Sequence, residues 1–136
     1  RVTYELMASY WPTEAAKRND PVIAKLMNSL PKIVFSKTLQ KVEWENTTLV
    51  KDNFKKVVQE LKKEAGKDAA IFGSSDLAVM FMEQGLIDEY RIMVNPVVLG
   101  DGKPLFKGIK NKVDLKLIKT KVFQSGNVLL YYEPKE

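Results

Sequence analysis

Residues 69–85 read AAIFGSSDLAVMFMEQG, and this stretch decides how the rest of the chain is interpreted. A short apolar run at 69–72 stops at Gly73, and a second apolar segment follows two serines. The pattern predicts a buried strand that turns into a helix. The turn has two interpretations. Either Ser75 or Asp76 simply caps the helix, or the backbone N–H groups of the turn, together with the positive end of the helix, bind a phosphate.

Periodic patterns predict the other elements. Apolar spacing of three and four residues, with caps and breakers at the ends, predicts helices at residues 2–10, 19–31, 51–66 and 76–84. Short apolar runs predict strands at 32–36, 47–51, 69–72 and 88–98, followed by a hairpin from 113–123 and 127–134.

Details at the element ends follow from the same patterns. Asp52 is the expected cap of the helix at 51–66, and Gly85 the expected end of the helix at 76–84. A phase change between Leu117 and Ile118 predicts a bulge in the hairpin. Together the elements predict one α/β domain, with a mostly parallel central sheet flanked by helices and a C-terminal antiparallel hairpin.

The composition excludes several classes of active site and binding site. The chain has 136 residues and neither cysteine nor histidine, which excludes disulfides, thiolate sites, histidine-ligated zinc and a Ser-His-Asp hydrolase. We therefore expect no metal site. No apolar run approaches the length of a membrane span, so we expect a cytoplasmic protein without a membrane partner. The net charge of +5 favours anionic ligands, but without an RNA-binding motif we expect a phosphorylated small molecule rather than nucleic acid.

Polar residues follow two of the expected strands. Ser36, Lys37 and Thr38 come after the strand at 32–36, and Gly73 opens the turn after the strand at 69–72. Ligands of parallel α/β sheets bind beyond the carboxyl ends of the strands. Each stretch alone is also compatible with an ordinary turn. Together they are compatible with the spread phosphate contacts of a dinucleotide, although GxGxxG is absent.

The order of the motifs resembles the dihydrofolate-reductase-like family, most closely the bacterial proteins related to the C-terminal reductase domain of the riboflavin-biosynthesis deaminase-reductase. The resemblance is carried by RVTYELMASYWP (1–12), KIVFSKTL (32–39), the block from IFGSSDL to GKPLF (71–106) and NVLLYYEP (127–134). It implies a three-layer dihydrofolate-reductase-like fold, NADPH as cofactor and a homodimer.

The resemblance also implies roles for particular residues. Three groups are expected to contact the cofactor: Arg1 and Thr3 at its phosphates, Ser36, Lys37 and Thr38 at the adenosine ribose and its 2′-phosphate, and Gly73, Ser74, Ser75 and Leu77 at the pyrophosphate.

Two departures from the family pattern bear on the substrate. Phe72 stands on the substrate side, where the riboflavin-pathway enzymes usually have an acid, and it cannot donate a proton. The family's first strand and the start of its first helix lie upstream of the motif at Arg1, so we expect that a segment precedes this sequence.

The catalytic residue is therefore unassigned. The expected function is hydride transfer from NADPH to a pyrimidine- or pterin-like ring, as in 5-amino-6-(5-phosphoribosylamino)uracil reductase. The alternatives are a true dihydrofolate reductase and a non-catalytic NADPH-binding dimeric protein.

Overall fold

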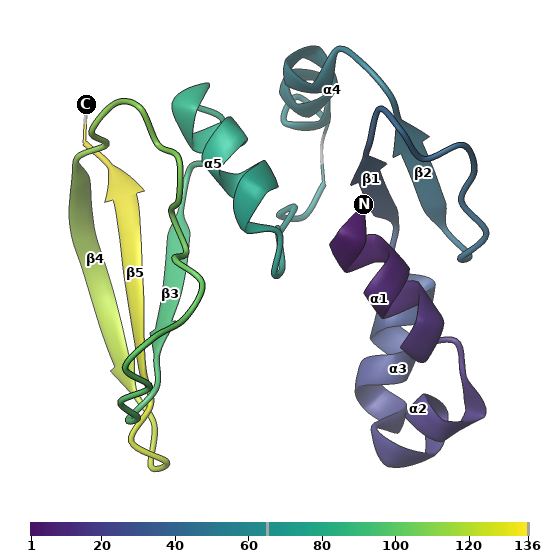
Figure 1. Ribbon diagram of the computed structural model, residues 1–136, viewed down its shortest axis with the longest axis horizontal. Helices are drawn as coiled ribbons and strands as arrows, with labels where there is room; N and C mark the ends of the chain where they lie inside the picture. Colours follow the sequence, from purple (N-terminus) through teal and green to yellow (C-terminus); the bar gives the residue numbers. More distant parts are fainter. Residues whose placement is uncertain (65, 136) are drawn as a thin grey trace. The chain divides into compact units, whose positions relative to one another are not determined.

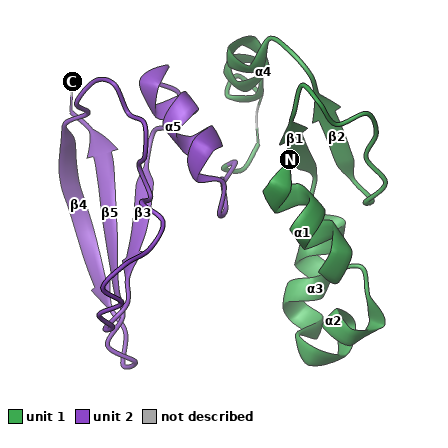
Figure 2. Ribbon diagram, in the orientation of Figure 1, with its two compact units in different colours: residues 1–68 green, residues 69–136 purple. Residues whose placement is uncertain are grey.

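The computed structural model describes residues 1–64 and 66–135, and these divide into two compact units, residues 1–68 and 69–136 (Figure 2). The first unit combines several helices with a small sheet and the second combines one helix with a small sheet, so the mixed α/β class is confirmed (Figure 1). In the described part of the chain, no helix has both the length and the apolar composition needed to cross a membrane.

The first unit contains a parallel pair of strands and several helices. Its elements are α1 (Val2–Tyr10), α2 (Glu14–Asn19), α3 (Pro21–Ser29), β1 (Lys32–Phe35), β2 (Thr47–Val50) and α4 (Phe54–Leu61). β1 and β2 are parallel and in register from Lys32 opposite Thr47. The helix α2 was not predicted. Its N-cap is Thr13, whose Oγ1 accepts a hydrogen bond of 3.2 Å from the Ala16 N–H.

The start of α4 differs from the prediction. The N-cap is Asn53, with a left-handed φ of 50°, rather than Asp52. Asparagine tolerates this conformation better than most residues, so the chain can turn sharply here before the helix begins. The helix is also shorter than the expected 51–66.

The second unit consists of one helix followed by a three-stranded antiparallel sheet. Its elements are α5 (Ser75–Glu83), β3 (Tyr90–Val94), β4 (Leu115–Val122) and β5 (Val128–Pro134), with β5 between the other two strands (Figure 1). The buried apolar residues of this unit are Val79, Phe81, Met82, Leu86 and Tyr90. They come from α5, from the segment that follows it and from the first residue of β3.

The predicted end of α5 is confirmed in detail. Gly85 has a φ of 63°, and its N–H donates to the carbonyl of Met82 at 3.0 Å. The next N–H, from Leu86, donates to the carbonyl of Phe81 at 2.9 Å. This pair of bonds is the Schellman motif, and it needs a residue that adopts positive φ without strain.

The hairpin and its bulge are also confirmed. The register between β4 and β5 shifts between Leu117 and Lys119. In the connecting turn the Gly126 N–H donates to the Phe123 carbonyl at 2.9 Å, and Gly126 has a φ of 86°. Glycine is therefore required here by the backbone.

The strand expected at 69–72 is wrong, because these residues join no sheet in the described chain. A run of four apolar residues becomes a strand only when a neighbouring strand accepts its hydrogen bonds, and apolar character does not reveal such a neighbour. Among the described strands, parallel pairing is limited to β1 and β2, and the sheet of the second unit is antiparallel.

Candidate functional site

The turn after β1 is built by Ser36. Its side chain is buried, with 7% of the residue exposed, and its Oγ accepts hydrogen bonds from the N–H groups of Thr38 at 3.3 Å and Leu39 at 3.1 Å. Its own N–H donates to the Val50 carbonyl at 3.0 Å, which extends the pairing with β2. Ser36 therefore shapes the turn, while Thr38 presents its hydroxyl at the surface.

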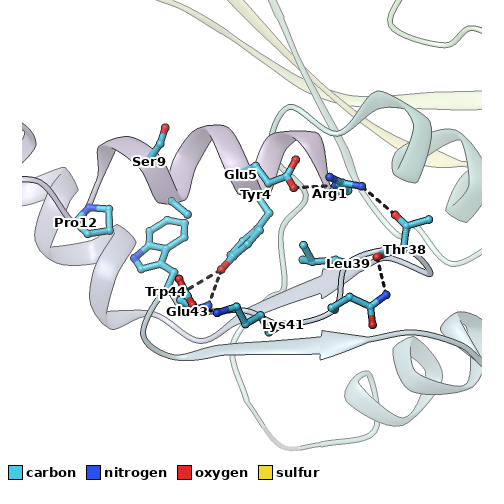
Figure 3. A pocket seen from close by; sticks show the side chains of 12 residues that line it. Arg1, Tyr4, Glu5, Ser9, Pro12, Thr38, Leu39, Lys41, Glu43 and Trp44 are labelled. Carbon is cyan, nitrogen blue, oxygen red and sulfur yellow. Dashed lines mark hydrogen bonds and ion pairs between the residues drawn. The ribbon is translucent and has the colours of Figure 1, made fainter.

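The structure brings Arg1 and Thr38 together although 37 positions separate them. The Nη1 of Arg1 lies 3.4 Å from the Thr38 Oγ1, and its Nε pairs with the Glu5 carboxylate at 2.8 Å (Figure 3). Lys37 is exposed and makes no ion pair with any residue the structure describes. Thr3, in the first turn of α1, is half-buried. Two cations and a hydroxyl come from this corner of the first unit, together with the Glu5 carboxylate that pairs with Arg1, and the net positive charge of these groups favours an anion.

An open pocket of about 640 Å³ begins at this corner (Figure 3). It lies between α1 and the loop that follows β1, and its lining includes Arg1, Tyr4, Thr38, Leu39 and Trp44. The rings of Tyr4 and Trp44 are 6.3 Å apart. Its size falls in the range typical of sites for small organic ligands, and its lining combines charged and aromatic groups.

Side chains from α3 and β1 hold the Trp44 ring in place. The indole N–H donates to the Asn28 Oδ1 at 2.7 Å, and the Lys32 Nζ lies 4.5 Å from the ring centroid. The same Nζ donates to the carbonyls of Met27, Asn28 and Leu30 at 2.9, 3.1 and 2.9 Å. A cation is favourable at these carbonyls, because they carry the negative end of the helix dipole.

Burial shifts the pKa of one charged group in this region. Partial burial lowers the pKa of Lys32, and the negative charge of Glu45 opposes that effect. The pocket edge also carries the exposed ion pair of Lys41 with Glu43, in which the hydrogen bond raises the pKa of Lys41 and lowers that of Glu43. The described residues contain no cluster of acidic side chains that could hold a metal ion.

The predicted pyrophosphate turn lies in the second unit. Gly73 has a φ of 64°, and the N-cap of α5 is Ser74 rather than Ser75 or Asp76. Ser75 begins the helix, and Leu77 is half-buried in its first turn. Phe72, expected on the substrate side, is 72% exposed. The geometry fits a helix start with a left-handed residue before it, and phosphate binding at this turn stays a prediction.

Sequence reasoning missed three residues that shape the pocket, namely Tyr4, Asn28 and Lys32. The hydrogen bonds of Tyr4 with Glu43 and Trp44, and of Asn28 with Trp44, join residues 16 to 40 positions apart in the sequence. No local sequence motif therefore indicates them. The one available signal was Lys32, a cation directly after a helix that ends at Pro31, where the carbonyls of the helix end need a donor.

Comparison with known proteins places the chain in a family. Residues 2–131 match the RibD C-terminal domain. Two proteins of Bacillus subtilis strain 168, described as uncharacterized, are similar in sequence. YyaP is 36% identical over 132 residues, which cover 97% of this chain and 70% of YyaP. YwjB is 36% identical over 99 residues, which cover 73% of this chain and 56% of YwjB.

Two solved structures are similar in fold. A putative riboflavin biosynthesis protein from Shewanella sp. PV-4 has 27% sequence identity and a TM-score of 0.69, over 79% of this chain and 62% of that protein. A pyrimidine reductase-like protein from Corynebacterium diphtheriae has 15% identity and a TM-score of 0.57, over 76% of this chain and 49% of that protein. The match over residues 2–131 and the identity to YyaP agree, and the chain belongs to the family of RibD C-terminal domains, a reductase-like family.

Proposed function

We propose that this protein is an NADPH-dependent reductase that transfers hydride to a pyrimidine- or pterin-like ring. The observation that carries the proposal is the match of residues 2–131 to the RibD C-terminal domain. The likeness to a putative riboflavin biosynthesis protein supports the same class of substrate. Nicotinamide supplies the hydride when the cofactor is bound, so the protein's task is to hold and orient two rings.

The chain's own residues fit the phosphates of such a cofactor. Arg1 lies beside the Thr38 hydroxyl, and Lys37 is exposed on the same turn. We assign these three residues to the adenosine 2′-phosphate, because a guanidinium, an ammonium and a hydroxyl all donate hydrogen bonds to phosphate oxygens. We assign Gly73, Ser74 and Ser75 to the pyrophosphate, because the start of α5 offers backbone N–H groups and a positive dipole end.

The proposal extends to the fold and the assembly. We propose that the chain has the three-layer dihydrofolate-reductase-like fold of the family. We further propose a homodimer that forms through the sheet of the second unit. Met93, Val94, Leu117, Ile118 and Val122 are exposed apolar residues of this sheet, which supports a covered surface. Light scattering is expected to give twice the mass of the monomer, and a monomer at micromolar concentration would contradict the dimer.

The test of the reaction is NADPH oxidation by the full-length gene product, followed by absorbance. The substrates to compare are 5-amino-6-(5-phosphoribosylamino)uracil and dihydrofolate. Turnover of the aminouracil supports the proposed reaction, and turnover of dihydrofolate alone assigns the protein as a dihydrofolate reductase. Binding of NADPH without turnover of either compound identifies a non-catalytic binding protein. An absence of both binding and turnover refutes the proposal.

A matched pair of charge reversals tests the cofactor side. Lys37→Glu is expected to raise the KM for NADPH about tenfold, because it replaces a cation beside the phosphate by an anion. Lys55→Glu makes the same change in net charge on α4, a different element from the turn that carries Lys37. It is expected to leave the KM within about twofold of the wild-type value. Equal effects of the two substitutions would mean that Lys37 acts only through overall charge.

A further inference from the structure

The loop at residues 37–46 joins β1 to β2 and forms one wall of the pocket, yet it contains neither helix nor strand. A loop without backbone ladders keeps its position only through contacts with neighbouring elements. At its beginning, the buried Ser36 Oγ accepts the N–H groups of Thr38 and Leu39. The part of the loop near residues 43 and 44 must be held by something else.

The hydroxyl of Tyr4 holds the backbone of this part of the loop, in addition to the hydrogen bond from the Trp44 indole to Asn28. It accepts hydrogen bonds from the backbone N–H groups of Glu43 at 3.1 Å and of Trp44 at 3.3 Å (Figure 3). Tyr4 belongs to α1, and Arg1, the N-cap of that helix, reaches Thr38 at 3.4 Å. One helix therefore contacts the loop at both ends of the pocket wall, with the pocket between the two contacts.

The two contacts differ in strength. The Tyr4 hydroxyl satisfies two backbone donors at once, whereas the contact between Arg1 and Thr38 is long and exposed. A hydrogen bond of 3.4 Å between exposed side chains contributes little on its own. The separation of Arg1 from Thr38 therefore depends on where the rest of the loop is held relative to α1.

We propose that Tyr4 is a positioning residue that sets the preference for a 2′-phosphorylated dinucleotide. Its hydroxyl holds the loop against α1 and thereby keeps Thr38 beside the Arg1 guanidinium, where both can contact one phosphate. This inference rests on the proposed use of NADPH. It adds a residue that does not touch the phosphate and acts through Arg1 and Thr38.

The test is Tyr4→Phe, with Tyr10→Phe as the matched control. Tyr10 lies on the same helix, and its hydroxyl makes no hydrogen bond with any described residue. Calorimetry on the full-length protein measures the Kd for NADPH and for NADH. In Tyr4→Phe the Kd for NADPH is expected to rise about tenfold, which corresponds to about 1.4 kcal/mol. The Kd for NADH, which has no 2′-phosphate, is expected to change less than about twofold.

A second measurement needs no cofactor. Hydrogen exchange of the backbone N–H groups at residues 38–44 is expected to be faster in Tyr4→Phe than in Tyr10→Phe, because the Glu43 and Trp44 donors lose their acceptor. Exchange that is the same in both variants overturns the positioning role directly.

The binding results separate the inference from the function on which it rests. Wild-type protein that does not bind NADPH refutes the proposed function. Wild-type protein that binds NADPH, together with a Tyr4→Phe variant of unchanged affinity, refutes the role of Tyr4 alone. Equal weakening of NADPH and NADH in that variant also overturns the inference, because it identifies a general structural defect.

Discussion

Replacing Asn28 by alanine tests how the pocket wall is anchored to the first unit. The Asn28 amide group donates to the carbonyls of Trp11 at 2.9 Å and Ala24 at 2.8 Å, and its Oδ1 accepts the Trp44 indole N–H at 2.7 Å. One side chain thus links α3 to the end of α1 and to the loop before β2. Asn28→Ala removes all three hydrogen bonds and leaves the indole donor of a residue that is 8% exposed without its partner.

The expected cost follows from these contacts. Each hydrogen bond contributes about 0.5–1.5 kcal/mol, and an unsatisfied buried donor costs about 1–3 kcal/mol, of which the lost bond is a part. Alanine has a higher helix propensity than asparagine, so the substitution also stabilises α3 by about 0.5 kcal/mol and offsets part of this loss. We therefore expect Asn28→Ala to lower the free energy of unfolding by about 2–3 kcal/mol.

The assay is urea denaturation followed by circular dichroism. Asn19→Ala is the matched control, because Asn19 is exposed at the end of α2 and its side chain makes no hydrogen bond with the residues described. This control is expected to cost less than about 0.5 kcal/mol. In a Trp44→Phe background, Asn28→Ala is expected to cost about 1 kcal/mol less, because the indole donor is already absent. Equal costs for Asn28→Ala and Asn19→Ala would refute the anchoring role.

Two further predictions concern the second unit. Gly126→Ala is expected to lower the free energy of unfolding by about 1–2 kcal/mol, because Gly126 has a φ of 86° and a Cβ there would lie 3.2 Å from the Pro96 Cγ. Gly102→Ala, where a Cβ meets open space, is the control, and equal midpoints in urea would contradict the prediction. Burial and the charge of Asp88 raise the pKa of Tyr90 above 10.0, so the folded state holds this proton more tightly than the unfolded state. This difference in proton affinity stabilises the folded protein fully below the pKa of the unfolded state, and the stabilisation is lost as the pH rises through the pKa of the folded state. Tyr90→Phe has no phenol to ionise, so the stability of this variant is expected not to fall in that pH range. Urea midpoints between about pH 9 and about pH 11 measure it, and identical pH profiles of the two proteins would exclude the role of Tyr90.

Much of the fold could be predicted because its signals are local. The end of α5 depends on Gly85 and two backbone hydrogen bonds within six residues, and the phase change near Ile118 marks a real register shift. The strand at residues 69–72 could not be judged in this way, because a strand depends on a partner from elsewhere in the chain. The six-residue helix α2 was missed because it is too short to show a periodic apolar pattern.

The residues of the candidate site likewise fall into some that the local sequence predicts and others that depend on contacts between distant parts of the chain. Ser36 and Thr38 follow directly from their place after an apolar run, although the structure shows that Ser36 builds the turn rather than presenting its hydroxyl. The family resemblance implied that Arg1 and Thr38 each contact the cofactor, but the contact between their side chains was not predicted. The roles of Tyr4 and Asn28 depend on side chains that meet across the fold, and only coordinates reveal such contacts.

A calorimetric titration of the full-length protein with NADPH and, separately, with NADH tests the proposed cofactor site. We expect NADPH to bind at least about tenfold more tightly than NADH, because only NADPH carries the phosphate that we assign to Arg1, Lys37 and Thr38. Thr38→Ala is expected to reduce this difference and to leave NADH binding nearly unchanged. Equal affinity for the two dinucleotides would contradict the assignment of that phosphate site, and no heat of binding with either would contradict the reductase itself.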